Sequence, residues 1–152
     1  MYQVMVVCLG NICRSPMAEG IMKQMLKQNG LEHKIAVSSA ATSAWEQGNP
    51  PHIGTQNILK RENISTKGMV SKQITAQDFQ ESDLILGMDQ QNVADLLNRA
   101  PDGTKKKIHL FLENGTKTAK EVPDPYYTGD FELTYQLIQQ GCKYWLEKIC
   151  IK

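Results

Sequence analysis

The sequence predicts an α/β fold of three layers, in which a four-stranded parallel sheet lies between helices. The first observation is that short apolar segments alternate along the chain with longer segments whose apolar residues recur at helical spacing. Strands that alternate with helices favour a parallel sheet covered on both faces. The second observation is that no repeat, low-complexity segment or linker interrupts the 152 residues. We therefore expect one domain over residues 1–152.

The amino-terminal segment predicts a strand, a loop and a helix in succession. Residues 4–7 are uniformly apolar, which suits a central strand buried on both faces. A loop is expected at residues 8–14, followed by Ser15 as the N-cap and Pro16 as the first helical residue. The helical spacing of apolar residues ends at residues 29–30, Asn-Gly, which are typical of a helix end. The loop after the first strand therefore opens onto the amino-terminal end of a helix.

The rest of the chain continues the alternation. Two prolines at residues 50–51 break the chain before a helix that passes through residues 58–59, and residues 93–97 indicate a further helix. Residues 122–125 are expected to form a loop, because prolines flank Asp124 on both sides. The remaining strand candidates are residues 35–37, 83–88 and 107–111. The apolar stripe of the last helix consists of Phe131, Tyr135, Ile138, Cys142, Trp145 and Ile149.

Composition excludes several classes of protein. The net charge is +1, so no overall field favours binding to nucleic acid or to an anionic membrane surface. No apolar segment approaches the roughly 18 residues that span a bilayer, and the first residues carry no basic leader of the kind that begins a signal peptide. Four cysteines are too few for a disulfide scaffold, and His33 and His109 lack the spacing of metal ligands. We expect a cytoplasmic protein with reduced thiols.

The most informative segment is the loop that begins at Cys8 and ends at Ser15. In parallel sheets, ligands bind beyond the carboxyl ends of the strands, where this loop lies. A helix amino terminus and a neighbouring arginine favour the thiolate form of a cysteine, which makes Cys8 a candidate nucleophile. Successive backbone N–H groups in such a loop form a concave site for an anion. The predicted phosphate-binding residues are Leu9, Gly10, Asn11, Ile12, Cys13 and Arg14.

Individual side chains of this loop suit the same chemistry. Gly10 permits a sharp turn of the backbone, and Asn11 tolerates a left-handed conformation. Arg14 can hold two phosphoryl oxygens with its planar guanidinium, and Ser15 can donate a hydrogen bond to the sulfur of Cys8. A lone Cys and Arg at this spacing is usually structural, a buried thiol beside a surface cation. Here a strand, a Gly-Asn turn and a proline-started helix coincide with them, so the catalytic interpretation is favoured.

At this point the sequence resembles the low-molecular-weight protein-tyrosine phosphatases. The resemblance rests on residues 8–16 and extends to residues 38–43, 48–51, 88–92 and 124–127, that is, over nearly the whole chain. It implies the fold predicted above, no metal or organic cofactor, and tyrosine-phosphorylated proteins as substrates. It also implies that Asp124 is the general acid, although an Asp between prolines is by itself most often a turn residue.

The resemblance implies further roles around the loop. Asn11 and Ser39 are expected to support the phosphate loop, and Cys13 to form a disulfide that protects Cys8, with a buried spectator thiol as the alternative. Trp45, Tyr126 and Tyr127 are expected to wall the substrate pocket, and core packing is the alternative for Trp45. The two tyrosines are also candidate targets of a tyrosine kinase, beside their simpler role as a pocket wall.

Other functions remain as alternatives. A branch of the family that cleaves phosphoarginine carries Thr at the position of Ile12 and lacks the paired tyrosines, so Ile12, Tyr126 and Tyr127 favour phosphotyrosine. An arsenate reductase would carry a further cysteine pair near residues 82–89, where this chain has none. A phosphocysteine carrier domain would not need Arg14 and Asp124 in these places, and a phosphate-binding module without turnover is the third alternative. Relatives often have an acidic residue at the position of His52.

Overall fold

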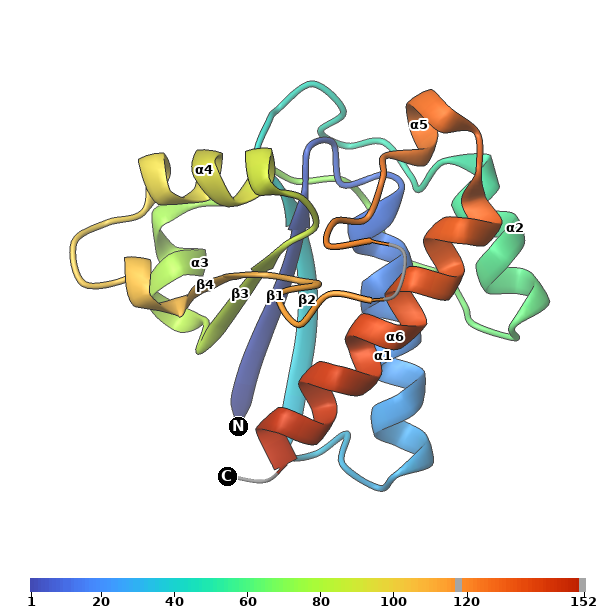
Figure 1. The fold of residues 1–152 in the computed structure, drawn as a ribbon, viewed down its shortest axis with the longest axis horizontal. Helices are drawn as coiled ribbons and strands as arrows, with labels where there is room; N and C mark the ends of the chain where they lie inside the picture. Colours follow the sequence, from blue (N-terminus) through green and yellow to red (C-terminus); the bar gives the residue numbers. More distant parts are fainter. Residues whose placement is uncertain (117–118, 151–152) are drawn as a thin grey trace.

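The computed structural model describes residues 1–116 and 119–150, and it contains the predicted parallel sheet. The four strands lie in the order β2-β1-β3-β4, and each neighbouring pair is parallel (Figure 1). This order places β1 and β3 side by side at the centre, where the chain switches from one half of the sheet to the other. The strands are β1 (Tyr2–Cys8), β2 (Ile35–Ala41), β3 (Leu84–Gly87) and β4 (Ile108–Leu110).

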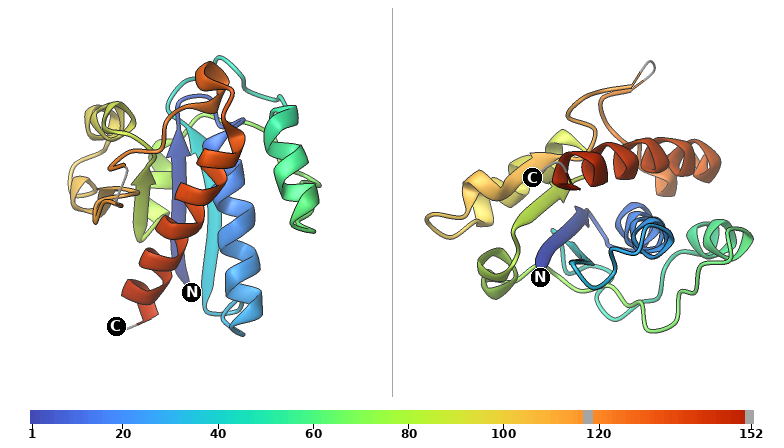
Figure 2. Two further views of the ribbon diagram at one scale, coloured as in Figure 1. Left: turned by 45° about the vertical axis from the view of Figure 1, so that its right-hand side comes forward. Right: turned by 90° about the horizontal axis from the view of Figure 1, so that it is seen from below.

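Helices cover both faces of the sheet, so the predicted three-layer α/β architecture is confirmed (Figure 2). On one face α1 and α6 pack against each other and on β1 and β2, with α2 beside them. On the other face α3 and α4 cover β3 and β4. The helices are α1 (Arg14–Gln28), α2 (Ile53–Arg61), α3 (Ala76–Glu81), α4 (Gln90–Arg99), the short 3-10 turn η1 (Lys105–Lys107), α5 (Pro125–Thr128) and α6 (Phe131–Cys150).

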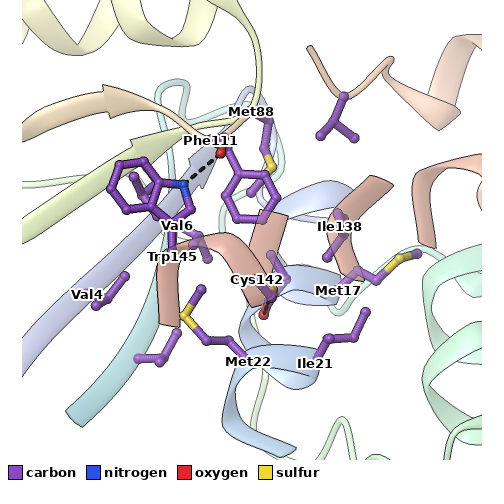
Figure 3. Packing of buried hydrophobic residues seen from close by; sticks show 14 of the residues in the cluster. Val4, Val6, Met17, Ile21, Met22, Met88, Phe111, Ile138, Cys142 and Trp145 are labelled. Atoms are coloured by element: carbon purple, nitrogen blue, oxygen red, sulfur yellow. Dashed lines mark hydrogen bonds between the residues drawn. The ribbon is translucent and has the colours of Figure 1, made fainter. Parts of the chain in front are cut away.

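The alternation of side chains along β1 explains how the two cores form. Val4 and Val6 point toward α1 and α6, whereas Met5 and Val7 point toward α3 and α4. All four side chains are buried, as expected for a central strand of a parallel sheet. On the α6 side Trp145 fills the core and donates its indole N–H to the Phe111 carbonyl at 2.7 Å (Figure 3). The two cores hold β1 rigidly, so the residue at its carboxyl end has a fixed position.

Two local predictions differ from the structure. Helix α1 begins at Arg14 with Cys13 at the N-cap position, so Ser15 is not the N-cap and Pro16 is the third helical residue. The hydroxyl of Ser15 lies next to Cys8 and Asn11 instead of capping the helix, and Pro16 needs no hydrogen-bond acceptor in the first turn. The predicted loop at residues 122–125 ends one residue early, because a proline at the first helical position begins α5.

The carboxyl ends of β1, β2 and β3 meet at one edge of the sheet (Figure 1). The backbone N–H of Thr42 donates to the Cys8 carbonyl at 3.0 Å, and the N–H of Met88 donates to the Val7 carbonyl at 3.1 Å. The N–H of Val122 in turn donates to the Met88 carbonyl at 3.0 Å. The loops that follow β1, β2 and β3 and the segment that precedes α5 therefore meet at the carboxyl end of β1. No helix within the described ranges is long and apolar enough to cross a membrane.

Candidate active site

The sulfur of Cys8 lies at the floor of the loop that joins β1 to α1. Cys8 is the last residue of β1 and is 2% exposed. The backbone N–H of Asn11 donates to Sγ at 3.3 Å, and the hydroxyl oxygen of Ser15 lies 3.1 Å from it. When the sulfur is a thiolate, the hydroxyl must be the donor, because a thiolate can only accept. The loop therefore curls over the sulfur and offers hydrogen bonds to its anionic form.

Asn11 gives the loop its shape and ties it to the sheet. Its φ of 55° is left-handed, as predicted for this residue. Its side-chain nitrogen donates to the hydroxyls of Ser15 at 2.7 Å and Ser39 at 3.0 Å, and its side-chain oxygen accepts from the N–H of Lys72 at 3.1 Å. Ser39 in turn donates to Glu19 at 2.5 Å. The structure thus places Asn11 and Ser39 together, and it adds Glu19 and Lys72, which the sequence did not indicate.

The prediction for Gly10 is wrong in its physical reason. Gly10 is absent from the residues of positive φ in the described chain, so the unusual backbone conformation falls on Asn11 alone. A Cβ at position 10 would lie 3.4 Å from the side chain of Glu46 and 3.7 Å from that of Ile12. These are ordinary contacts at the rim of the pocket. Neither a positive φ nor a lack of space therefore requires glycine at position 10.

Arg14 is buried beside the loop and is held by segments from elsewhere in the chain. Its Nη1 donates to Asp89 at 2.6 Å and to the Val122 carbonyl at 3.0 Å, and its Nη2 donates to Asp124 at 3.3 Å. Its Nε has no hydrogen-bond partner within residues 1–116 and 119–150. Burial alone would lower the pKa of Arg14, but the charge of Cys8, the bond to Asp89 and the charge of Asp124 outweigh it and raise this pKa. Arg14 is therefore a fixed cation with a free donor.

Asp124 is part of the turn that begins α5, and it also lines the cavity beside Cys8. One carboxylate oxygen accepts from the N–H of Tyr126 at 3.1 Å, which makes Asp124 the N-cap of α5. The other oxygen faces Arg14, and the side chain is 21% exposed. The cap fixes the direction of the carboxylate, and the remaining exposure leaves it accessible. Asp124 therefore lies at the rim of the site with one oxygen directed inward.

A cavity of about 150 Å³ joins the loop to the aromatic side chains. The residues Trp45, Tyr126 and Tyr127 are 78%, 59% and 75% exposed. This exposure excludes core packing as the role of Trp45. The residues that line this cavity are Cys8, Leu9, Gly10, Ile12, Cys13, Trp45, Glu46, Asp124, Tyr126 and Tyr127. Glu46 is the lining residue that the sequence did not indicate. A larger cleft, about 570 Å³, lies behind Asn11 and contains neither Cys8 nor Asp124, so size alone does not mark the site.

Cys13 lines the same cavity, but its environment disfavours the thiolate form that a nucleophilic cysteine needs. Burial, followed by the charges of Cys8 and Asp124, raises the pKa of Cys13 to about 12. Cys13 is buried and free, and its carbonyl accepts from the hydroxyl of Thr55 at 2.9 Å. Its thiol is therefore protonated near neutral pH. The structure places both cysteines at one cavity, which is consistent with either of the roles weighed for Cys13.

The sequence missed the principal partner of Arg14. Asp89 and Asn92 form a reciprocal capping box at the start of α4. The second oxygen of Asp89 pairs with Arg14, 75 residues earlier. The available signal was the position of Asp89 directly after a strand adjacent to β1. Carboxyl ends of neighbouring parallel strands meet at one edge, so a charged residue there lies near the phosphate loop.

Comparisons with known proteins agree with this geometry. Residues 3–152 match the family model described as low molecular weight phosphotyrosine protein phosphatase. The chain is 46% identical to the low molecular weight protein-tyrosine-phosphatase YfkJ of Bacillus subtilis, covering 98% of this chain and 96% of that protein. It is 45% identical to the phosphatase PtpA of Staphylococcus aureus, covering 93% and 90%.

Solved structures extend the comparison. The crystal structure of YfkJ superposes with a TM-score of 0.94 and covers 98% of this chain and 94% of that one. The Drosophila arginine phosphatase is 33% identical, with a TM-score of 0.88 and 96% of each chain covered. The same fold therefore occurs in proteins named as protein-tyrosine phosphatases and in one named as an arginine phosphatase.

Proposed function

Because the chain belongs to the low molecular weight phosphotyrosine protein phosphatase family, we propose that it hydrolyses phosphotyrosine through a phosphocysteine formed on Cys8. The chain is a protein-tyrosine phosphatase; the proposal concerns its mechanism and its residues. One observation carries it: the sulfur of Cys8 lies under the N–H of Asn11 and the hydroxyl of Ser15, in a cavity that Asp124 also lines. A sulfur surrounded by hydrogen-bond donors and a carboxyl group at the same cavity suit nucleophilic attack with acid catalysis.

In the first step the thiolate of Cys8 attacks phosphorus, and the bond from phosphorus to the phenolic oxygen breaks. Asp124, protonated, gives its proton to the leaving oxygen, so tyrosine departs as a neutral phenol. The backbone N–H groups of residues 9–13 and the guanidinium of Arg14 bind the equatorial oxygens. The support for Arg14 is that Nε and Nη2 can donate side by side, which is the bidentate geometry suited to a phosphoryl group.

In the second step water hydrolyses the phosphocysteine. Asp124 is now a carboxylate and takes a proton from water as the water oxygen attacks phosphorus. The sulfur–phosphorus bond breaks, inorganic phosphate leaves and the thiolate of Cys8 returns. Ser15 assists because its hydroxyl, 3.1 Å from the sulfur, stabilises the departing thiolate by a hydrogen bond. Asn11 and Ser39 are assigned to hold this hydroxyl and the loop in place.

The proposed substrate is a protein that carries phosphotyrosine. Trp45, Tyr126 and Tyr127 present exposed rings at the entrance, and Leu9 and Ile12 line the apolar sides near the sulfur. Such walls suit a flat aromatic ring, which gains stacking and apolar contact there. A guanidinium can also stack on these rings, so phosphoarginine is the alternative to be compared directly.

Three further assignments belong to the proposal. Cys13 is assigned to form a reversible disulfide with oxidised Cys8, because both thiols meet the same cavity. Tyr126 and Tyr127 are assigned as targets of a tyrosine kinase, since their rings are largely exposed. We place the protein in the cytoplasm, where a reducing environment keeps the nucleophile active.

Rapid kinetics with single substitutions test the proposal. The wild type should hydrolyse p-nitrophenyl phosphate and a phosphotyrosine peptide, and rapid quenching followed by mass spectrometry should detect phosphate on Cys8. Cys8→Ser should bind vanadate weakly and turn over neither substrate, whereas Cys150→Ser, which removes an exposed thiol elsewhere, should behave as the wild type. Asp124→Asn should lower kcat about 10²–10⁴-fold with a smaller effect on KM. Turnover by Cys8→Ser would refute the covalent mechanism.

A comparison of substrates separates the alternatives. The wild type should hydrolyse phosphotyrosine faster than phosphoarginine and should not reduce arsenate with a thiol reductant. Faster hydrolysis of phosphoarginine would refute the substrate assignment but leave the mechanism in place. Binding of phosphate without turnover of any substrate would refute both. For Cys13, peroxide inactivation should be reversed by dithiothreitol in the wild type and not in Cys13→Ser.

A further inference from the structure

We propose that His52 is a positioning residue that holds Tyr126 in place as a wall of the substrate pocket, an inference that rests on the proposed function. His52 is the N-cap residue of α2, and its backbone N–H donates to the carbonyl of Ile12 at 2.7 Å. Ile12 belongs to the phosphate loop and lines the pocket. The backbone of His52 is therefore joined to one side of the site, and its side chain extends to the other.

A hydrogen bond fixes the orientation of the imidazole ring. The Nδ1 of His52 accepts from the backbone N–H of Gly54 at 3.0 Å, which caps α2. Because Nδ1 accepts, the proton of the neutral ring is on Nε2. Rotation of the ring about the Cβ–Cγ bond would therefore break the hydrogen bond that caps α2.

The fixed ring contacts two aromatic side chains that follow the catalytic Asp124. It stacks on Phe131, the first residue of α6, with centroids 5.0 Å apart and planes 21° apart. It also meets Tyr126 of α5 edge-on, with centroids 6.1 Å apart and planes at 81°. A Cβ on Gly54 would lie 2.5 Å from the Phe131 ring, so this ring rests directly on the first turn of α2. Figure 1 shows α5 and the start of α6 beside this end of α2.

Tyr126 needs such support because the residue is 59% exposed. Its other aromatic neighbour is Tyr127, edge-on at 5.2 Å, which is itself 75% exposed. His52 is the member of this group whose orientation is fixed by a backbone hydrogen bond, and it is not among the residues that line the pocket. It acts through Tyr126, which would otherwise have to be ordered when an aromatic substrate binds.

Two substitutions separate the ring contact from the helix cap. His52→Asn keeps an N-cap acceptor and removes the ring, whereas His52→Phe keeps a ring and removes the acceptor. We expect His52→Asn to raise KM for p-nitrophenyl phosphate about three- to tenfold, because an aromatic contact is lost, with kcat within about twofold. His52→Phe keeps a ring but loses the hydrogen bond that orients it, so it should raise KM less than His52→Asn does and should lower the midpoint of thermal unfolding. His33→Asn, at an exposed turn, is the matched control and should change neither.

Inhibition by inorganic phosphate provides a second readout, because phosphate contacts the loop and not the aromatic wall. Its inhibition constant should be unchanged in His52→Asn if the effect is on Tyr126. An unchanged KM in His52→Asn, or an inhibition constant for phosphate that rises with KM, would overturn the inference. Either result would leave the proposed function intact, since the wild type would still hydrolyse the aryl phosphate. A wild type without turnover would instead refute the proposed function.

Discussion

Replacement of Asp89 by alanine should destabilise the protein much more than the loss of a helix cap. Asp89 caps α4 with one oxygen, and its other oxygen accepts from buried Arg14 at 2.6 Å. The substitution therefore removes the cap and also leaves part of a buried cation without its closest counter-charge. Because Arg14 is assigned to bind the phosphoryl group, kcat/KM should fall as well.

The magnitude follows from the two contacts. Loss of an aspartate cap costs about 1 kcal/mol of the free energy of unfolding. The side chains of Arg14 and Asp89 are 2% and 24% exposed, so their ion pair lies between a surface pair and a fully buried one. Since Arg14 keeps Val122 and Asp124 as acceptors, we assign about 2 kcal/mol to the lost pair. The total of about 3 kcal/mol corresponds to a fall of about 6–12 °C in the unfolding midpoint for a chain of this size.

Urea unfolding with a matched control tests this prediction. Thr75 forms the same reciprocal capping box at the start of α3 without an arginine partner, so Thr75→Ala should cost only about 1 kcal/mol. Asp89→Asn keeps one acceptor oxygen for the cap but turns an NH2 donor toward Arg14, so it should cost about 2 kcal/mol, the share assigned to the lost pair alone. The slope of the free energy against urea should be the same in all variants. If Asp89→Ala cost no more than Thr75→Ala, the reasoning about the buried ion pair would be wrong.

Three further predictions concern the loop, the pH dependence of stability and the core. Asn11→Gly keeps the left-handed backbone but loses the side-chain bonds, so kcat/KM should still fall about tenfold or more; wild-type kinetics would show that the backbone conformation alone is required. Burial alone would raise the pKa of Glu113, but the hydrogen bond and charge of Lys148 outweigh it and lower this pKa. The ionised Glu113 therefore contributes its full stabilisation above about pH 4.3, the pKa of an unfolded glutamate, and this contribution is lost as the pH falls through the lower pKa of the folded state. In acid-unfolding curves, Glu113→Gln should show no such loss of stability. Gly141→Ala should destabilise the protein by about 1–3 kcal/mol in thermal unfolding although alanine favours helices, because the new methyl group meets the Phe111 ring; a stabilised variant would contradict this packing.

The fold could be predicted because its signals are local. A continuous apolar run predicted β1, and the alternation of strands with helices predicted the parallel sheet. Helix boundaries were less accurate, since the sequence favoured Ser15 as an N-cap and the structure gives that position to Cys13. The physical reason is competition for one hydroxyl, which is taken by Cys8 and Asn11. A residue's capping propensity describes its local preference and does not include hydrogen bonds to residues that the fold brings close.

The site could be predicted only where its residues are contiguous or belong to a familiar motif. The loop from Cys8 to Arg14 is continuous in sequence, so the chemistry proposed for it could be inferred without coordinates. The pair of Arg14 and Asp89, and the bond from Ser39 to Glu19, join residues on different elements. No local pattern specifies which charged side chain will lie opposite another across a sheet edge.

The contacts of Arg14 connect the stability of the fold to the order of the site. The guanidinium of a side chain that is 2% exposed carries a large desolvation penalty unless its donors are satisfied. Its acceptors come from the loop after β3 and from the segment before α5, at Asp89, Val122 and Asp124. Displacement of either segment would leave the cation short of partners, so the native fold favours the arrangement in which both surround Arg14. The bonds that satisfy the buried charge therefore also order the proposed phosphoryl-binding group before any substrate arrives, and this preorganisation lowers the free energy that binding must spend on positioning it.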